Sequence, residues 1–221
     1  MSELLHILLH INDYLDAWIQ SYGSLIYVIL FAIIFVETGL VIMPFLPGDS
    51  LLFAAGALCA RIAGEQDPAL SIFPMILLLS VAAILGDHSN YLIGKFAGAK
   101  ILGIQIRGKR LVQEKYVTQT ENFFSKYGTK AIVLARFVPI VRTFTPFVAG
   151  IGKMEYRKKF MPYDIFGGIL WISSMSLAGY VLGSHEWVKK HFEAVVIGIV
   201  LLSISPMVFA YIKHLLNKNK S

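Results

Sequence analysis

The chain has 221 residues, of which 56% are hydrophobic, and its formal net charge is +6. A mean hydropathy of +0.65 is too high for an ordinary soluble domain, so we expect an integral membrane protein with a single membrane domain over residues 1–221. The basic residues cluster in loops beside hydrophobic runs, which is not the pattern of a nucleic-acid-binding protein. The single cysteine, Cys59, leaves no internal disulfide framework.

The first 22 residues predict an amphipathic helix that lies at the membrane interface. Apolar residues recur there at spacings of four and three, and polar residues occupy the other positions. A short packing helix without a membrane role is the alternative, because periodicity does not separate the two. The segment has no positive region and no small-residue cleavage site, so we expect it to be retained rather than cleaved as a secretory signal.

Four hydrophobic stretches are long enough to cross a membrane, which takes about 20 residues. They cover residues 25–43, 71–95, 160–183 and 192–216. Two further apolar segments, 44–60 and 130–150, are short and interrupted by prolines. We expect both to be re-entrant, which means that each enters and leaves the membrane on one side. The interrupting prolines are Pro44, Pro47, Pro139 and Pro146.

Lysines and arginines close to the spans predict the orientation, because cytoplasmic loops are enriched in them. The basic loop or helix 96–129 and the loop 153–159 therefore belong in the cytoplasm. Segment 130–150 then has both ends on the cytoplasmic side, whereas segment 44–60 enters from the outer side. The N- and C-termini are both expected in the cytoplasm.

The two halves of the chain, residues 25–95 and 130–216, thus contain one re-entrant segment each. The sequence predicts an all-α membrane protein with about four spanning helices, two opposed re-entrant helical hairpins and an interfacial N-terminal helix. Such an inverted repeat is typical of transporters in which broken helices form the binding site near the membrane midplane. Six simple spans are the alternative.

The first broken segment is associated with two acids. Gly48 permits the backbone conformations that a sharp turn needs. Asp49 suits the N-cap of a half-helix that begins near Ser50, and this structural role competes with a functional one. Glu37 follows a long apolar run and has no cation in its own helix. Because a buried carboxyl without a cation tends to take up a proton, we interpret Glu37 and Asp49 as proton-coupling residues; an interfacial Glu37 that reaches water is the alternative.

The second broken segment carries Arg136 and Arg142, six residues apart. Their planar guanidinium groups suit phosphate or carboxylate. Two interpretations stay open: ion pairs with Glu37 and Asp49, or a cradle for an anionic substrate, with both in turn as a third. The turn and hinge positions of this segment are expected at Pro139, Pro146 and Gly150.

A secondary polar site is predicted at Asp87 and Tyr91, which are four residues apart and share a helix face. His88 is interpreted as a local hydrogen-bonding residue and Asp164 as part of the helix packing. No second histidine lies at metal-ligand spacing, so we expect no metal and no cofactor. The sequence also lacks a nucleophile elbow, a zinc-protease motif and a Ser–His or Cys–His set, so we expect no enzyme.

Several motifs of the chain point to one family. They are Glu37-Thr-Gly-Leu, Pro44-Phe-Leu-Pro-Gly-Asp49, Gly86-Asp87 with Tyr91 and Gly94, and the segment Ala135–Gly150 with Arg136 and Arg142. These motifs resemble those of the DedA family of bacterial inner-membrane proteins, of the SNARE-associated or VTT-domain superfamily, over about residues 20–215. By motif, Glu37 and Asp49 match the family's essential membrane acids, and Arg136 and Arg142 match its essential arginines.

The resemblance implies a role linked to lipid translocation and to tolerance of drugs and alkaline conditions that depends on the proton-motive force. Our leading hypothesis is a multi-pass transporter of the bacterial inner membrane that uses protons to translocate an anionic lipid, undecaprenyl phosphate or a glycerophospholipid. A proton- or sodium-coupled antiporter of small molecules is one alternative. A non-transport factor that affects lipid composition and envelope integrity is another. A homo-oligomer is compatible with the sequence, which does not specify an oligomeric state.

Overall fold

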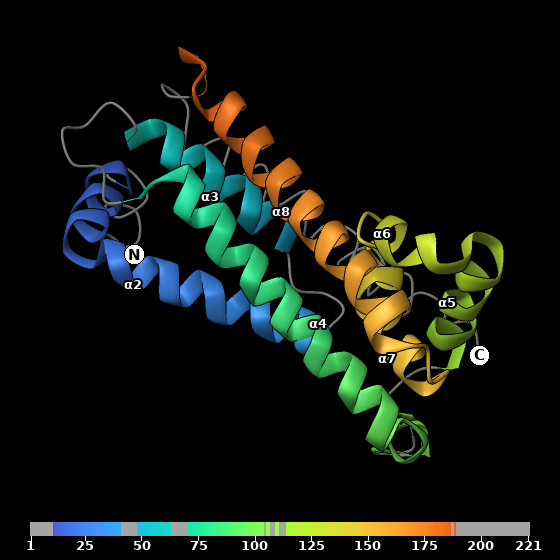
Figure 1. Cartoon of the computed structure of the whole chain (residues 1–221). Helices are drawn as coiled ribbons and strands as arrows, with labels where there is room; N and C mark the ends of the chain where they lie inside the picture. The colour runs from blue at the N-terminus through green and yellow to red at the C-terminus, as the bar shows by residue number, and fades with distance from the viewer. Residues whose placement is uncertain are drawn as a thin grey trace, which may run out of the picture. The chain divides into compact units, whose positions relative to one another are not determined.

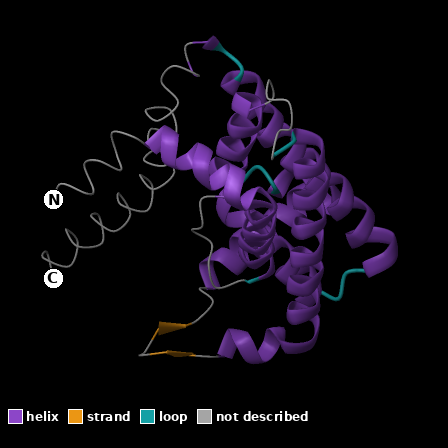
Figure 2. Ribbon diagram, turned by 90° about the vertical axis from the view of Figure 1, so that its left-hand side faces the viewer, coloured by secondary structure: helices purple, strands orange, loops and turns teal. Residues whose placement is uncertain are grey.

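The computed structural model of the protein describes residues 11–40, 48–62, 70–103, 105–106, 109–110, 114–186 and 188. Within these residues the regular structure is helical, apart from the two-residue strands β1 (Gln105–Ile106) and β2 (Lys109–Arg110), which pair antiparallel (Figure 1 and Figure 2). The predicted all-α class is therefore confirmed. The described residues form two compact units, and helices α2, α4 and α8 contribute to both.

The first unit contains the start of α2 (Ile11–Gly39), all of α3 (Gly48–Ile62), the start of α4 (Ile72–Gly103) and the end of α8 (Met161–Gly183). Helices α3 and α8 touch backbone to backbone, since a Cβ atom on Gly56 would lie 2.0 Å from the carbonyl oxygen of Ser176. Small residues permit this approach, which is common between membrane helices. The backbone of α2 is non-helical at Tyr22, where the predicted interfacial helix ends.

The second unit contains the rest of α2 and α4, most of α8, and the helices between them. Its apolar core joins Phe144, Phe147 and Val148 of α7 to Val117 of α5. A second cluster packs Tyr91 against Phe160, with ring centroids 4.6 Å apart. The helices between α4 and α8 are α5 (Glu114–Tyr127), η1 (Gly128–Lys130), α6 (Ala131–Ala135), α7 (Pro139–Ile151) and the single π-helical turn η2 (Tyr156–Phe160).

Two helices in the described part of the chain are long and apolar enough to cross a membrane, Ile72–Gly98 and Tyr156–Gly183. Only 39% and 33% of their most apolar windows are buried, and large apolar side chains face outward, among them Phe96 at 77% and Val181 at 65% exposure. This exposure suits lipid better than water. These helices match the predicted spans 71–95 and 160–183. The predicted span 25–43 contains the shorter apolar helix Leu25–Gly39, and the predicted span 192–216 lies outside the described residues.

The turn positions predicted from prolines and glycines need corrections. Pro44 and Pro47 lie outside the described residues. Helix α3 begins at Gly48, so Asp49 lies inside its first turn and does not cap a helix that begins near Ser50. Pro146 does not break the second segment, because it lies within α7 and the side chains around it are buried. Tertiary packing outweighs the backbone hydrogen bond that the proline lacks.

Gly150 is likewise a packing residue and not a hinge. It lies inside α7, one residue before the end of that helix. A Cβ atom at this position would lie 2.2 Å from the carbonyl oxygen of Tyr91 in α4. The absence of a side chain therefore lets α7 pack directly on α4.

Candidate functional site

The second broken segment has its break between the two predicted arginines. Arg136 forms the C-cap of α6, and Pro139 is the first residue of α7. Val138 between them is extended, with φ −117° and ψ 102°, because a residue before proline avoids the helical region. Proline suits the first position of a helix, where its missing N–H has no helical partner. The turn predicted at Pro139 is therefore present, and Arg136 and Arg142 lie on its two sides.

Arg142 pairs with Glu37 of α2. The Nη2 atom of Arg142 lies 2.7 Å from Oε1 of Glu37, and the Glu37 side chain is only 4% exposed. The guanidinium carbon of Arg142 also lies 4.9 Å from the ring centroid of Trp171, within cation–π range. Of the two interpretations for this arginine, the structure contains the internal ion pair.

Arg136 contacts two acids, and neither is Glu37 or Asp49, the partners that the sequence suggested for the arginines. Its Nη2 atom lies 2.6 Å from Oδ1 of Asp164 in α8 and also contacts Oδ2 of Asp87 in α4. All three side chains are buried. The interpretation of Asp164 as a packing residue is wrong, because its carboxylate holds a guanidinium. Asp87 belongs to the same cluster, which we call the Arg136 triad: Arg136, Asp87 and Asp164.

A sequence signal for the Asp164 contact exists in hindsight. Asp164 is followed one turn later by Gly167 and Gly168. A Cβ atom on Gly168 would lie 3.6 Å from Nη2 of Arg136, and one on Gly167 would lie 3.1 Å from Cα of Val133 in α6. Gly167 leaves room on α8 for α6, whereas a Cβ atom on Gly168 would be in ordinary van der Waals contact with the guanidinium. The signal in the sequence is the acid itself, because a carboxyl inside an apolar span needs a partner.

His88 and Tyr156 extend the triad by a chain of polar contacts. The Nε2 atom of His88 lies 3.5 Å from Oδ2 of Asp164, and its Nδ1 atom lies 3.0 Å from the hydroxyl of Tyr156. The side chain of His88 is 18% exposed. Tyr91, which was predicted to share a site with Asp87, has a different partner: its hydroxyl donates to the carbonyl oxygen of Met154, 2.5 Å away.

Asn90 is a buried polar residue whose role the sequence did not suggest. Its side-chain amide donates to the carbonyl oxygens of Thr38 in α2 and Thr143 in α7, both at 3.0 Å. Thr38 follows Glu37, and Thr143 follows Arg142. One side chain of α4 thereby holds together the two backbone segments that carry the Arg142–Glu37 pair.

Asp49, the remaining predicted site residue, belongs to the first unit. It lies in the first turn of α3, where the positive end of the helix dipole favours a carboxylate. Its predicted pairing with an arginine stays a prediction. In the described residues no group of three His, Cys, Asp or Glu side chains is arranged to hold a metal ion.

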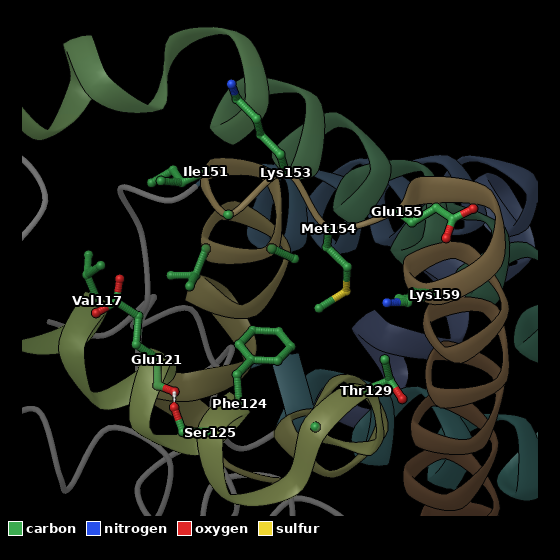
Figure 3. Close-up of a pocket in the computed structure, with 14 residues that line it drawn as sticks. Val117, Glu121, Phe124, Ser125, Thr129, Ile151, Lys153, Met154, Glu155 and Lys159 are labelled. Atoms are coloured by element: carbon green, nitrogen blue, oxygen red, sulfur yellow. Dashed lines mark hydrogen bonds between the residues drawn. The ribbon is translucent and has the colours of Figure 1, made fainter.

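A pocket of about 720 Å³ lies in the second unit, lined by residues between Val117 and Lys159 (Figure 3). Its wall is partly apolar, with Phe124 of α5 and Met154 directed into it in Figure 3. The charges of its lining are balanced, because the lining contains two lysines, Lys153 and Lys159, and two glutamates, Glu121 and Glu155. The pocket therefore has no net preference for one sign of charge.

The chain was compared with known proteins. The family model of the VTT domain matches residues 46–181. Protein DedA of Escherichia coli is 43% identical over 211 residues, which are 96% of this chain and 93% of DedA. An uncharacterized membrane protein of Mycobacterium tuberculosis is 40% identical over 84% of this chain and 78% of its own length. The inner membrane protein YghB of Escherichia coli is 34% identical over 82% of this chain and 79% of its own length. No solved structure matches the chain.

Both the domain match and the relatives cover most of the chain, and the names of the last two relatives describe them as membrane proteins. The long apolar helices with outward-facing side chains agree with those names. The motifs that carry the resemblance, around Glu37, Asp87 and Arg136, are also the ones that the structure brings together in the second unit. The chain belongs to the VTT-domain family and is a membrane protein of the DedA family.

Proposed function

We propose that the protein is a transporter of the bacterial inner membrane that uses the proton-motive force to translocate an anionic lipid. Undecaprenyl phosphate is the first choice of lipid and a glycerophospholipid the second. The observation that carries the proposal is a pair of buried arginines on the two sides of a helix break, each held by carboxylates. A guanidinium that binds a carboxylate in a bidentate or single contact also suits a lipid phosphate.

The transport step in this proposal is an exchange of partners. A proton on Glu37 removes the charge of that carboxylate, so Arg142 becomes able to bind the phosphate of the lipid. Loss of the proton restores the ion pair and expels the phosphate to the other side. Asp49 is the second proposed proton-coupling residue, and Arg136 is the second proposed phosphate ligand. Transport in this scheme involves no covalent chemistry, and we propose no enzymatic activity.

The proposed membrane arrangement has about four spans, two opposed re-entrant hairpins, and both termini in the cytoplasm. The break at residues 136–138 supports a hairpin in segment 130–150, because it divides the segment into two short helices. The start of α3 at Gly48 supports a second half-helix in segment 44–60. Half-helices that meet near the midplane are a usual way to build a transporter site.

A proton- or sodium-coupled antiporter of small molecules is the second candidate. It is favoured by the charge count of the site, since among the described residues three carboxyls, Glu37, Asp87 and Asp164, surround two arginines. In that case the acids carry the ion and the arginines only tune them.

The test is a lipid-flipping assay with the full-length protein in proteoliposomes, with and without a pH gradient. The wild type is expected to move labelled undecaprenyl phosphate faster when the gradient is present, whereas Arg142→Ala and Glu37→Gln abolish the gain. Lys158→Ala is the matched control, because it removes an exposed cation paired at 3.5 Å with Glu155. Flipping by Arg142→Ala and Glu37→Gln at the wild-type rate contradicts the proposal. Gradient-driven movement of a drug without movement of lipid favours the antiporter.

A further inference from the structure

The buried polar network of the second unit has one negative charge too many. In the described residues it contains the carboxyls of Glu37, Asp87 and Asp164 and the guanidiniums of Arg136 and Arg142. All three acids are 4% exposed or less. Burying an uncompensated charge is costly, and such a group takes up a proton instead. The network is neutral if it holds one proton.

The surplus charge lies at the Arg136 triad. Arg142 pairs with Glu37, so each of these two residues has a group of opposite charge. Asp87 and Asp164 both contact the same atom, Nη2 of Arg136. Two carboxylates that share one site repel each other, and a single proton shared between them removes the repulsion. The two acids therefore act as one site for a single proton.

His88 is the competing location for this proton, and the geometry argues against it. An imidazolium that donates to a carboxylate forms a short bond, about 2.7–2.9 Å between heavy atoms. The His88 Nε2 atom lies 3.5 Å from Oδ2 of Asp164. His88 instead bonds to the hydroxyl of Tyr156, which suits a neutral ring that exchanges protons between its two nitrogens.

The same contacts form a path from the triad to the surface. The path runs from Asp164 through His88 to Tyr156. The hydroxyl of Tyr156 lies 3.0 Å from Nδ1 of His88, whereas Nε2 of His88 is 3.5 Å from Asp164, so a proton crosses this step only when the ring moves closer to the carboxyl. Tyr156 is the first residue of η2, and the next residues, Arg157 and Lys158, are exposed. The titratable and charged groups that face the site come from six elements. They are Glu37 of α2; Asp87, His88 and Tyr91 of α4; Arg136 at the end of α6; Arg142 of α7; Tyr156 of η2; and Asp164 of α8.

We propose that Asp87 and Asp164, held by Arg136, form a proton-binding site of this protein, and that His88 and Tyr156 exchange its proton with the surface at the basic loop. The two acids lie on two proposed spans, Asp87 on α4 and Asp164 on α8. Binding and release of the proton therefore change the total charge of the two carboxyls that contact Arg136. The inference rests on the proposed function for its use in coupling, because a proton-driven transporter needs such a site. It adds a site to the proposed pair Glu37 and Asp49 and does not require lipid to be the substrate.

The test measures the proton directly, by infrared spectroscopy of the purified full-length protein in detergent at neutral pH, without substrate. The wild type is expected to show the C=O stretch of a protonated carboxyl. Both Asp164→Asn and Asp87→Asn lose it, because each leaves one acid for one arginine. Glu155→Gln and Lys158→Ala, each of which removes one member of an exposed ion pair, keep it. A wild-type spectrum without a protonated carboxyl, or a band that survives in both triad variants, overturns the proposal.

The proposed path is tested by transfer of the protein into D₂O. The carboxyl band shifts when its proton is replaced by deuterium, and this shift is expected to be several-fold slower in His88→Gln and Tyr156→Phe than in the wild type. These variants keep both acids, so the test does not depend on the folding of an Asn variant. Unchanged exchange in both variants overturns the path. If the triad is protonated but the protein flips no lipid, the proton-binding site is supported and the proposed function is contradicted. If the protein flips lipid but shows no carboxyl band, the proposed function is supported and the proton-binding site is contradicted.

Discussion

The two arginines on the sides of the helix break lie six residues apart, yet their surroundings differ. Arg142 pairs with Glu37, and its guanidinium carbon lies 4.9 Å from the ring centroid of Trp171. Arg136 holds two acids from two different helices, and the guanidinium is 6% exposed. A neutral pair opens when one proton or one anion arrives, whereas a triad keeps its arginine held after the first proton. In the proposed exchange of partners, Arg142 is therefore the arginine that we expect to become available first. Arg136 contacts acids on both α4 and α8.

The largest expected effect separates the two arginines by stability. Arg136→Ala leaves two buried acids without their cation, and removing one partner of a buried pair costs about 3–5 kcal/mol. Arg142→Ala leaves one such acid. We expect the melting temperature in detergent to fall further for Arg136→Ala than for Arg142→Ala. Arg136→Lys is the control, since an ammonium keeps the charge but lacks the planar fork. Equal losses for the two alanine variants contradict the contrast between pair and triad.

A smaller effect on stability is expected when the acids are neutralised, and here the Arg142–Glu37 pair is expected to lose more stability than the triad. Glu37→Gln leaves Arg142 without the carboxylate at 2.7 Å, and a hydrogen bond to a charged group contributes about 1.5–3 kcal/mol. Asp164→Asn replaces one of the two acids that share a proton in the proposed triad and keeps the shape of the side chain, so we expect little loss of stability. Thermal unfolding of the two variants at neutral pH measures the difference. A greater loss in Asp164→Asn than in Glu37→Gln contradicts a triad in which two acids share one proton.

The comparison also shows what the sequence could predict. Hydropathy predicts the spans 71–95 and 160–183, because a long apolar run needs no knowledge of its neighbours, and the helices match them within a few residues. Proline chemistry predicts the start of α7 at Pro139 for the same local reason. Arg136, Arg142, Glu37 and Asp87 were selected from the sequence as charged residues in or beside apolar segments, whereas Asp164 was misread as a packing residue.

The partners of those residues could not be predicted, because pairing is a tertiary property. Arg136 meets Asp87, 49 positions earlier, and Asp164, 28 positions later, and no periodicity relates them. The contacts depend on how α4, α6 and α8 pack, and one close approach is at Gly167 of α8, where a Cβ atom would lie 3.1 Å from Cα of Val133 in α6. Pro146 and Gly150 were misjudged for a related reason, since burial in α7 outweighs their local preference for turns.

Asn90 offers a way to loosen the pair without touching the triad. Its amide bonds to the carbonyls of Thr38 and Thr143 hold α2 and α7 together next to Glu37 and Arg142. Asn90→Ala removes both of these hydrogen bonds, and a single hydrogen bond contributes about 0.5–1.5 kcal/mol. Ser89→Ala is the matched control on the same helix, because its hydroxyl bonds only within α4, to Leu85. We expect the melting temperature to fall for Asn90→Ala and to change little for Ser89→Ala, and the infrared band of the triad to persist in both. Loss of the band in Asn90→Ala shows that pair and triad act as one unit.

The smallest expected effect on stability comes from Tyr156→Phe, which changes the proposed proton path from the triad and leaves the three triad residues in place. The substitution keeps a ring that packs against Tyr91 and Phe160, with centroids 5.2 and 6.1 Å away, and removes the hydroxyl bonded to His88. A single hydrogen bond contributes about 0.5–1.5 kcal/mol, so the melting temperature falls slightly. Tyr163→Phe is the control, since Tyr163 packs against the same apolar cluster. Proton-driven transport is expected to slow in Tyr156→Phe and not in Tyr163→Phe, because only Tyr156 lies on the path to Asp164. Equal transport rates in the two variants show that the hydroxyl of Tyr156 serves packing of the histidine and carries no proton.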